Sequence, residues 1–210
     1  MNFPAVILLA IAAIAASGCA TTHVENPHGI APQSFDSGTR GPVAGIGIEG
    51  QDIVAMTDQM MRDMLGNARL AGNAKAPRVI IDAEYFANDG AQPINRNTIT
   101  DRLRVNLNRA SQGRMSFVGR QYAAMVQHER DLKRQGVTDV GTVGLAKAQA
   151  GGDFRLGGRI ATVDARNPRT GIVQRYNQVT FEMVDLESSE IVWSGMYEFS
   201  RAAADSVIYR

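Results

Sequence analysis

Few side chains in this sequence have the types and spacings that catalysis requires, because the chain holds three histidines and one cysteine. A serine or cysteine nucleophile needs a base beside it, and histidine is the usual base. His23 and His28 lie among small and polar residues, which leaves His128 as the one histidine expected in a folded part. Residues 129–131 are charged, so we expect His128 on the solvated face of a helix. No second cysteine or histidine pair stands at ligand spacing, and we predict no zinc site.

Carboxylates are the remaining groups with the chemistry of an acid and a base. Asp82 and Glu84 have the side chains that hydrolyse a glycosidic bond, but residues two apart on a strand usually face water together. The G-x-S-x-G and S-x-x-K signatures of serine hydrolases and penicillin-binding enzymes are absent from the sequence. The sequence therefore predicts a protein that is not an enzyme, with catalysis as the weaker alternative.

Residues 45–50 match G-x-G-x-x-G, a pattern that binds the pyrophosphate of a dinucleotide when it joins a buried strand to a helix. The preceding residues 41–44 are too few, and too interrupted by glycine and proline, to form that strand. We therefore predict no cofactor, and we expect this segment to be a flexible connection to the first helix.

Cys19 is the residue with the most specific chemistry. It ends the sequence Ala-Ser-Gly-Cys, which follows an uncharged apolar run over residues 3–16. That run is too short to span a bilayer, so we predict a removable export signal over residues 1–18. The four-residue pattern is typical of bacterial lipoprotein processing, which predicts diacylation of Cys19, palmitate included, and a firm membrane anchor. The alternative is an ordinary export signal that leaves Cys19 as a free thiol.

The residues after the cysteine predict where the protein goes and how it is attached. Ala20, in place of Asp, resembles a signal for sorting to the outer membrane, on its periplasmic face. Residues 19–50 are rich in small and polar side chains, so we expect a flexible lipidated tether. Such a tether spans roughly 30 Å as a random coil and at most about 100 Å when extended. Residues 51–210 are expected to fold as one globular domain.

Charge gives one local signal and no global one. The net charge of +1 supplies no argument for nucleic acid as a partner. Between residues 96 and 120, however, there is a single acid, Asp101, against six arginines, at positions 96, 102, 104, 109, 114 and 120. Because arginine binds carboxylates and phosphates through two parallel hydrogen bonds, Arg102, Arg104 and Arg109 are candidates for docking an acidic partner or a glycan phosphate. The alternative is a solvated helix face, balanced by the acids Glu182, Asp185, Glu187 and Glu190.

Apolar spacing predicts the elements that position these residues. Met56, Met60 and Met64 recur at helical spacing between Asp52 and Gly66, which predicts a helix whose methionines fill the core, with a promiscuous binding face as the alternative. The other expected elements are a strand at 79–85, a helix at 99–110, a strand at 115–118, helices at 122–136 and 138–150, and strands near residues 154–160, 179–183 and 191–199. Short turns between the last three strands predict an antiparallel meander. The expected fold class is α+β, with helices on one face of a mixed sheet.

Several local sequences resemble the LpoB family. They are residues 51–58, residues 141–148 with 153–156, and the closing Ile-Val-Trp-Ser-Gly at 191–195. The resemblance implies a fold related to the amino-terminal domain of TolB and to the curli secretion lipoprotein CsgG. It also implies an outer-membrane lipoprotein that activates a bifunctional penicillin-binding protein, the synthase that polymerises and cross-links peptidoglycan, without catalysis of its own.

A CsgG-like structural or assembly lipoprotein, which oligomerises into a secretion pore, is the main alternative. A pore needs membrane-spanning strands of about ten residues with a continuous apolar face. We find no insertion in the sequence that supplies such strands, so we expect a monomer. A family member with a different periplasmic partner is the third hypothesis that the residues leave open.

Overall fold

The computed structural model describes residues 32–42, 44–70 and 75–204 of the chain. The chain divides into two compact units, Met1–Phe35 and Asp36–Arg210. Only residues 32–35 of the first unit are described, and they form no helix or strand. Cys19 and the predicted export signal therefore lie outside the described residues. All the elements named below belong to the second unit.

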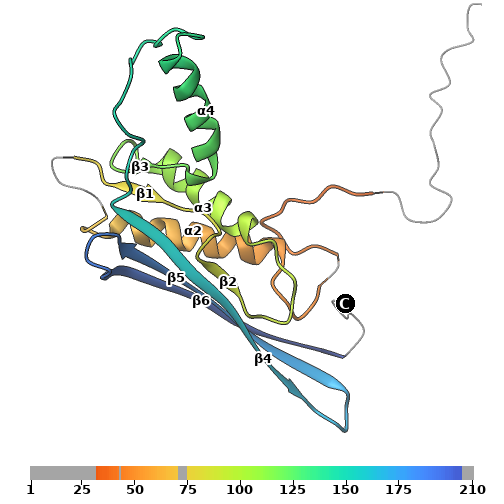
Figure 1. The fold of residues 1–210 in the computed structure, drawn as a ribbon. Coiled ribbons are helices and arrows are strands. Elements are labelled where there is room, and N and C mark those ends of the chain that lie inside the picture. The colour runs from red at the N-terminus through yellow and green to blue at the C-terminus, as the bar shows by residue number, and fades with distance from the viewer. Residues whose placement is uncertain (1–31, 43, 71–74, 205–210) are drawn as a thin grey trace, which may run out of the picture. The chain divides into compact units, whose positions relative to one another are not determined.

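A mixed sheet forms the centre of the second unit (Figure 1). Its strands run in the order β3-β1-β4-β5-β6, and β2 pairs with β4 farther along that strand. The short strands pair in parallel, whereas β4, β5 and β6 form a long antiparallel meander. The bounds are β1 (Arg78–Ile80), β2 (Phe86–Asn88), β3 (Ser116–Phe117), β4 (Phe154–Arg166), β5 (Ile172–Asp185) and β6 (Ile191–Ala204). The predicted α+β class and the C-terminal meander are confirmed.

Two helices, α2 (Gly50–Gly66) and α3 (Arg96–Ala110), pack against each other on one face of the sheet (Figure 1). Their apolar residues recur three and four apart, so one stripe of each helix enters the core. Met56, Met60 and Met64 are each at most 2% exposed, which confirms that these methionines fill the core. The same core includes Ile99, Leu103 and Leu107 of α3 and Leu156, Ile160, Val179, Phe181 and Met183 of the meander.

The strand predicted over residues 79–85 is wrong, because the chain turns in the middle of it. Strand β1 ends at Ile80, and β2 begins only at Phe86. Between them, Asp82 Oδ1 accepts a hydrogen bond from the backbone N–H of Glu84 at 3.1 Å, an arrangement that turns the chain. Ile80 and its neighbour Ile81 are both buried, so the alternation of inward and outward side chains that predicts a strand stops here.

The helix predicted over residues 138–150 is also wrong, since these residues form a loop. Gly141 and Gly144 have φ angles of +65° and +76°, which a right-handed helix does not allow. The loop follows a 3-10 turn, η1 (Arg120–Tyr122), and helix α4 (Ala123–Arg134). Figure 1 shows α4 projecting beside β3, and it buries no residue. Helices α2 and α3 cover one face of the sheet, as predicted, while α4 lies outside this layer.

Candidate functional site

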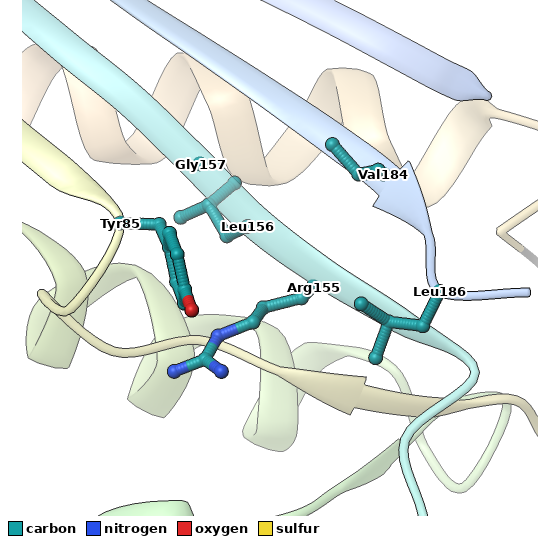
Figure 2. A pocket seen from close by; sticks show the side chains of 6 residues that line it. All are labelled: Tyr85, Arg155, Leu156, Gly157, Val184 and Leu186. Carbon is teal, nitrogen blue, oxygen red and sulfur yellow. The ribbon is translucent and has the colours of Figure 1, made fainter. Parts of the chain in front are cut away.

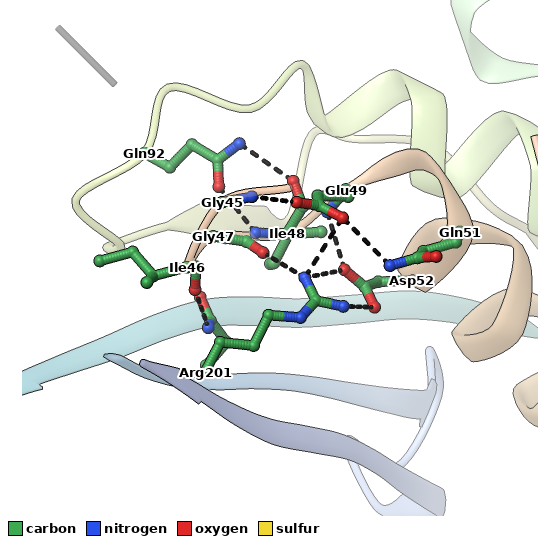
Figure 3. Close-up of polar contacts among 10 residues, drawn as sticks. Gly45, Ile46, Gly47, Ile48, Glu49, Gln51, Asp52, Gln92 and Arg201 are labelled. Atoms are coloured by element: carbon green, nitrogen blue, oxygen red, sulfur yellow. Dashed lines mark hydrogen bonds and ion pairs between the residues drawn. The ribbon is translucent and has the colours of Figure 1, made fainter. Parts of the chain in front are cut away.

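Polar contacts fasten the glycine-containing segment that precedes α2 (Figure 3). The Glu49 carboxylate accepts a hydrogen bond from the N–H of Gly45, and Asp52 Oδ2 accepts one from the N–H of Glu49 at 2.8 Å. Gln92 binds both backbone groups of Ile48, through Oε1 to its N–H at 2.8 Å and through Nε2 to its carbonyl at 3.0 Å. Ile48 is 4% exposed and belongs to the core.

Arg201 of β6 joins this segment to the sheet (Figure 3). Its Nη1 donates to the Gly47 carbonyl at 2.8 Å, and its two terminal nitrogens donate to the Asp52 carboxylate at 2.9 and 2.7 Å. Glu49 lies 3.6 Å from the same guanidinium, which also lies 4.5 Å from the ring centroid of Phe199. We call Arg201, Gly47, Glu49 and Asp52 the Arg201 cluster.

The Arg201 cluster corrects the expectation of a flexible connection before α2. The second unit begins at Asp36, and the domain boundary predicted between residues 50 and 51 stays a prediction. The carboxylates of Glu49 and Asp52 also lie at the N-terminus of α2, where the pyrophosphate of a dinucleotide would bind. The G-x-G-x-x-G match therefore has a structural role, in which the chain's own acids occupy the end of the helix.

The arginines predicted to dock a partner do not share one surface. Arg102 donates from Nε to Thr57 Oγ1 at 3.0 Å, and its Nη2 lies 3.5 Å from Asp58 Oδ1, so it links α3 to α2. Arg104 donates from Nη1 to the carbonyl of Ile81 at 3.4 Å. Because each residue turns a helix by about 100°, the side chains of Arg102 and Arg104 leave α3 in directions about 200° apart around its axis. They lie on opposite sides of the buried stripe of α3.

Arg109 differs from these two, because its exposed side chain forms no hydrogen bond or ion pair with other residues that the structure describes. Arg96 and Arg114 donate to the backbone carbonyls of Phe86 and Leu65, respectively. Most of the positive charge that is concentrated in the sequence is thus used in separate contacts within the fold. Docking through the three predicted arginines stays a prediction.

A cleft lies beside Tyr85 and Arg155, between the turn after β1 and the meander (Figure 2). The Arg155 guanidinium lies 4.5 Å from the ring centroid of Tyr85 and donates to the carboxylates of Asp82, at 2.9 Å, and Glu84. Burial opposes the charge of Arg155, but these hydrogen bonds outweigh it and raise its pKa. The other walls are the apolar Leu156, Val184 and Leu186. We call this the Tyr85 cleft; its charges are paired within the chain.

The remaining chemical candidates of the sequence do not form a site in the described residues. Asp82 and Glu84, expected to face water, both bind Arg155, a partner more than seventy positions away that no local pattern indicated. His128 is exposed on α4. In the described ranges, no three His, Cys, Asp or Glu side chains are grouped so that they could hold a metal ion. No described helix has the length and apolar character needed to cross a membrane.

A comparison with known protein families gives a match for this chain. The model of the family described as "Peptidoglycan-synthase activator LpoB" matches residues 52–199, which extend from the first turn of α2 into β6. The chain belongs to the LpoB family. Its relatives in that family are activators of peptidoglycan synthases, which supports a location in the cell envelope. A search of curated proteins gives no significant match.

Solved structures include similar chains. The chain is 20% identical to the LpoB C-terminal domain from Salmonella enterica, with a TM-score of 0.40 over 68% of this chain and 94% of that one. It is 15% identical to lipoprotein GNA1162 from Neisseria meningitidis, with a TM-score of 0.30 over 63% of this chain and 87% of that one. The expected likeness to TolB and CsgG stays a prediction.

Proposed function

We propose that this LpoB-family protein is an outer-membrane lipoprotein that binds a bifunctional penicillin-binding protein and activates it without catalysing a reaction itself. The family match supports the proposal most strongly, because it spans the elements from α2 to β6 that build the core. The lipoprotein pattern that ends at Cys19 adds an anchor of two acyl chains, which hold a protein to a membrane far more firmly than one.

Activation by such a protein acts on the conformations of the synthase. A ligand that binds the active conformation more tightly than the inactive one shifts the population toward the active one. Raising the active fraction from about 1% to about 50% requires roughly a hundredfold preference, or about 2.7 kcal/mol of differential binding. A packed unit with a preformed surface is suited to this task, because little binding energy is lost in ordering the surface.

The position of the anchor sets how far the second unit reaches from the membrane. Because that unit begins at Asp36, 17 residues from Cys19 to Phe35 precede it within the predicted tether of residues 19–50. Fully extended, they span at most about 60 Å, compared with about 100 Å for the longer tether expected from composition. The docking domain of the synthase must therefore come close to the outer membrane.

A binding assay with the full lipidated chain in detergent tests the proposal. Each bifunctional synthase of the source cell is immobilised on a surface, and a monofunctional synthase from the same cell serves as the control. We expect the chain to bind at least one bifunctional synthase and to accelerate its glycan polymerisation. If the folded chain binds none of them, the proposal is refuted.

A further inference from the structure

A second cleft lies beside α4, between that helix, the end of β3 and the loop that follows α4. Val126 and Arg130 form the helix wall, because residues four apart share one face of a helix. Phe117 and Arg120 line it from the β3 side, and Ala148 lines it from the loop. Its volume of about 380 Å³ exceeds the 220 Å³ of the Tyr85 cleft. We call it the α4 cleft.

Two arginines line the α4 cleft, and no carboxylate does. The guanidinium of half-buried Arg120 forms no hydrogen bond or ion pair with any residue in the described ranges. Arg130 donates from Nη2 to the carbonyls of Ala146 and Lys147 at 2.8 and 3.1 Å, while its Nε is buried without a hydrogen-bond partner. Arg155 of the Tyr85 cleft has a buried Nε of the same kind, so the α4 cleft is distinguished by the guanidinium of Arg120, which no described carboxylate binds.

The acids of α4 are bound to other cations. Glu129 Oε1 lies 3.8 Å from Lys133 Nζ, and Asp131 Oδ1 lies 3.4 Å from Arg134 Nη1. Neither acid lines the cleft. The positive charge of the cleft is therefore complementary to a carboxylate from outside the chain, which guanidinium groups bind through charge-assisted hydrogen bonds.

Exposed apolar side chains occur on the same segment of the chain, from η1 through α4 into the loop that follows it, and Val126, which lines the cleft, is 39% exposed. Tyr122 and Met125 are 52% and 64% exposed, and α4 buries none of its residues. The loop adds the exposed residues Val137, Val140, Val143 and Leu145. Exposed apolar residues in such number are available for contact with a partner. Figure 1 shows α4 projecting beside β3, and none of its residues is buried by the rest of the fold.

We propose that the α4 cleft docks an acidic segment of the synthase, whose carboxylate binds between Arg120 and Arg130 while adjacent apolar side chains pack on α4. This inference rests on the proposed function and adds the chemistry of the segment that is bound. The Tyr85 cleft is less suited to the role, because Arg155 is already bound by two carboxylates of this chain.

Two variants of the full lipidated chain test the inference, each with a matched control. Arg120→Glu reverses the charge of the cleft, and Arg62→Glu makes the same change at an exposed arginine of α2. Ala148→Trp fills the α4 cleft from an exposed position, and Gly157→Leu fills the Tyr85 cleft instead. A Cβ atom at Gly157 meets only the carbonyl oxygen of Tyr85, at 3.6 Å. Circular dichroism and thermal unfolding verify that all four variants fold.

We expect Arg120→Glu and Ala148→Trp to bind the immobilised synthase about tenfold more weakly or worse, as at other interface hot spots, and the two controls to bind as the wild type does. Arg120→Gln should also reduce the dependence of binding on salt, because salt screens an ion pair and a purely structural role would leave that dependence unchanged. If both α4-cleft variants bind like the wild type, the inference is overturned and the proposed function stands. If the wild type binds no synthase, both are overturned.

Peptidoglycan itself carries carboxylates on its peptide stems, so sedimentation with purified sacculi is the second arm of the test. We expect the wild type and Arg120→Glu to sediment with sacculi to the same extent. If Arg120→Glu loses sacculus binding and keeps its affinity for the synthase, the cleft binds cell-wall peptide and the inference is wrong.

Discussion

Replacing Arg201 by methionine tests the Arg201 cluster most directly. Methionine keeps an apolar stem near Phe199 but removes the guanidinium that binds Gly47 and Asp52. The side chain of Asp52 is 6% exposed, so its carboxylate would remain buried without a positive partner. Breaking a buried pair in this way costs about 3–5 kcal/mol. Arg201 itself is 24% exposed, which allows water to replace part of its effect, so we expect a loss near the lower end, about 3 kcal/mol.

Urea unfolding of a soluble chain that begins at Ala20 measures this loss. Trp193 is the only tryptophan, it is 6% exposed, and its Nε1 donates to Asp63 at 2.9 Å, so its fluorescence should report the loss of the core. With a slope of about 2 kcal/mol per molar urea, a loss of about 3 kcal/mol lowers the unfolding midpoint by about 1.5 M. Amide hydrogen exchange at Ile48 reports how often the segment before α2 separates from the sheet.

An exposed ion pair supplies the matched control. Arg69 and Glu190 are 57% and 62% exposed, so Arg69→Met should lower the free energy of unfolding by less than about 1 kcal/mol. The double variant, Arg201→Met with Asp52→Asn, has a neutral amide in place of the unpaired carboxylate. Its free energy of unfolding should therefore fall by about 1–2 kcal/mol less than the sum of the decreases in the two single variants. Equal midpoints for Arg201→Met and Arg69→Met, or strict additivity in the cycle, would refute the reasoning.

Asp164→Asn should lower stability at neutral pH by about 0.5–1 kcal/mol, because the hydrogen bond from Arg175 lowers the pKa of Asp164, although solvent screens the pair. This stabilisation is present above the pKa of Asp164 in the unfolded chain, about 3.9, and is lost as pH falls through its lower pKa in the folded chain. The melting temperatures of the variant and the wild type should therefore converge in acid. A difference that stays constant with pH would show that the ionised Asp164 carboxylate is not its cause. Gly158→Ala should cost about 1–3 kcal/mol, because its Cβ would overlap the buried ring of Phe86, while Gly157→Ala should be nearly neutral in the same urea assay. Cys19→Ser should move the protein from the membrane to the soluble fraction of cells; unchanged membrane recovery would count against lipidation.

The regular elements of the fold were predictable because their patterns are local. Met56, Met60 and Met64 recur every four residues, and one face of α2 is buried along this line. Strand β5 alternates buried and half-buried residues, since helices cover one face of the meander and leave the other open. The LpoB family was also predictable, because short sequences carry the resemblance, and the family match confirms it.

Contacts between distant positions were not predictable from one sequence. The segment before α2 has the composition of a flexible linker, yet it is held by Arg201, which lies 149 positions beyond Asp52. The α4 cleft depends on the path of a loop in which Gly141 and Gly144 adopt positive φ, where apolar spacing predicts a helix. A concentration of arginines along the sequence likewise could not show which of them would be used inside the fold.

The contacts of the Arg201 cluster also affect how a mechanical load on the chain ahead of α2 would reach the fold. The lipid proposed at Cys19 would pull on the chain ahead of α2, where Asn177 of β5 donates to the Ile46 carbonyl and Arg201 of β6 holds Gly47 and Glu49. Tension from such an anchor would be shared with β6, which is hydrogen-bonded along its length to β5, instead of separating α2 from the core at its first turn. An anchored molecule stretched across the periplasm would keep its shape under that pull.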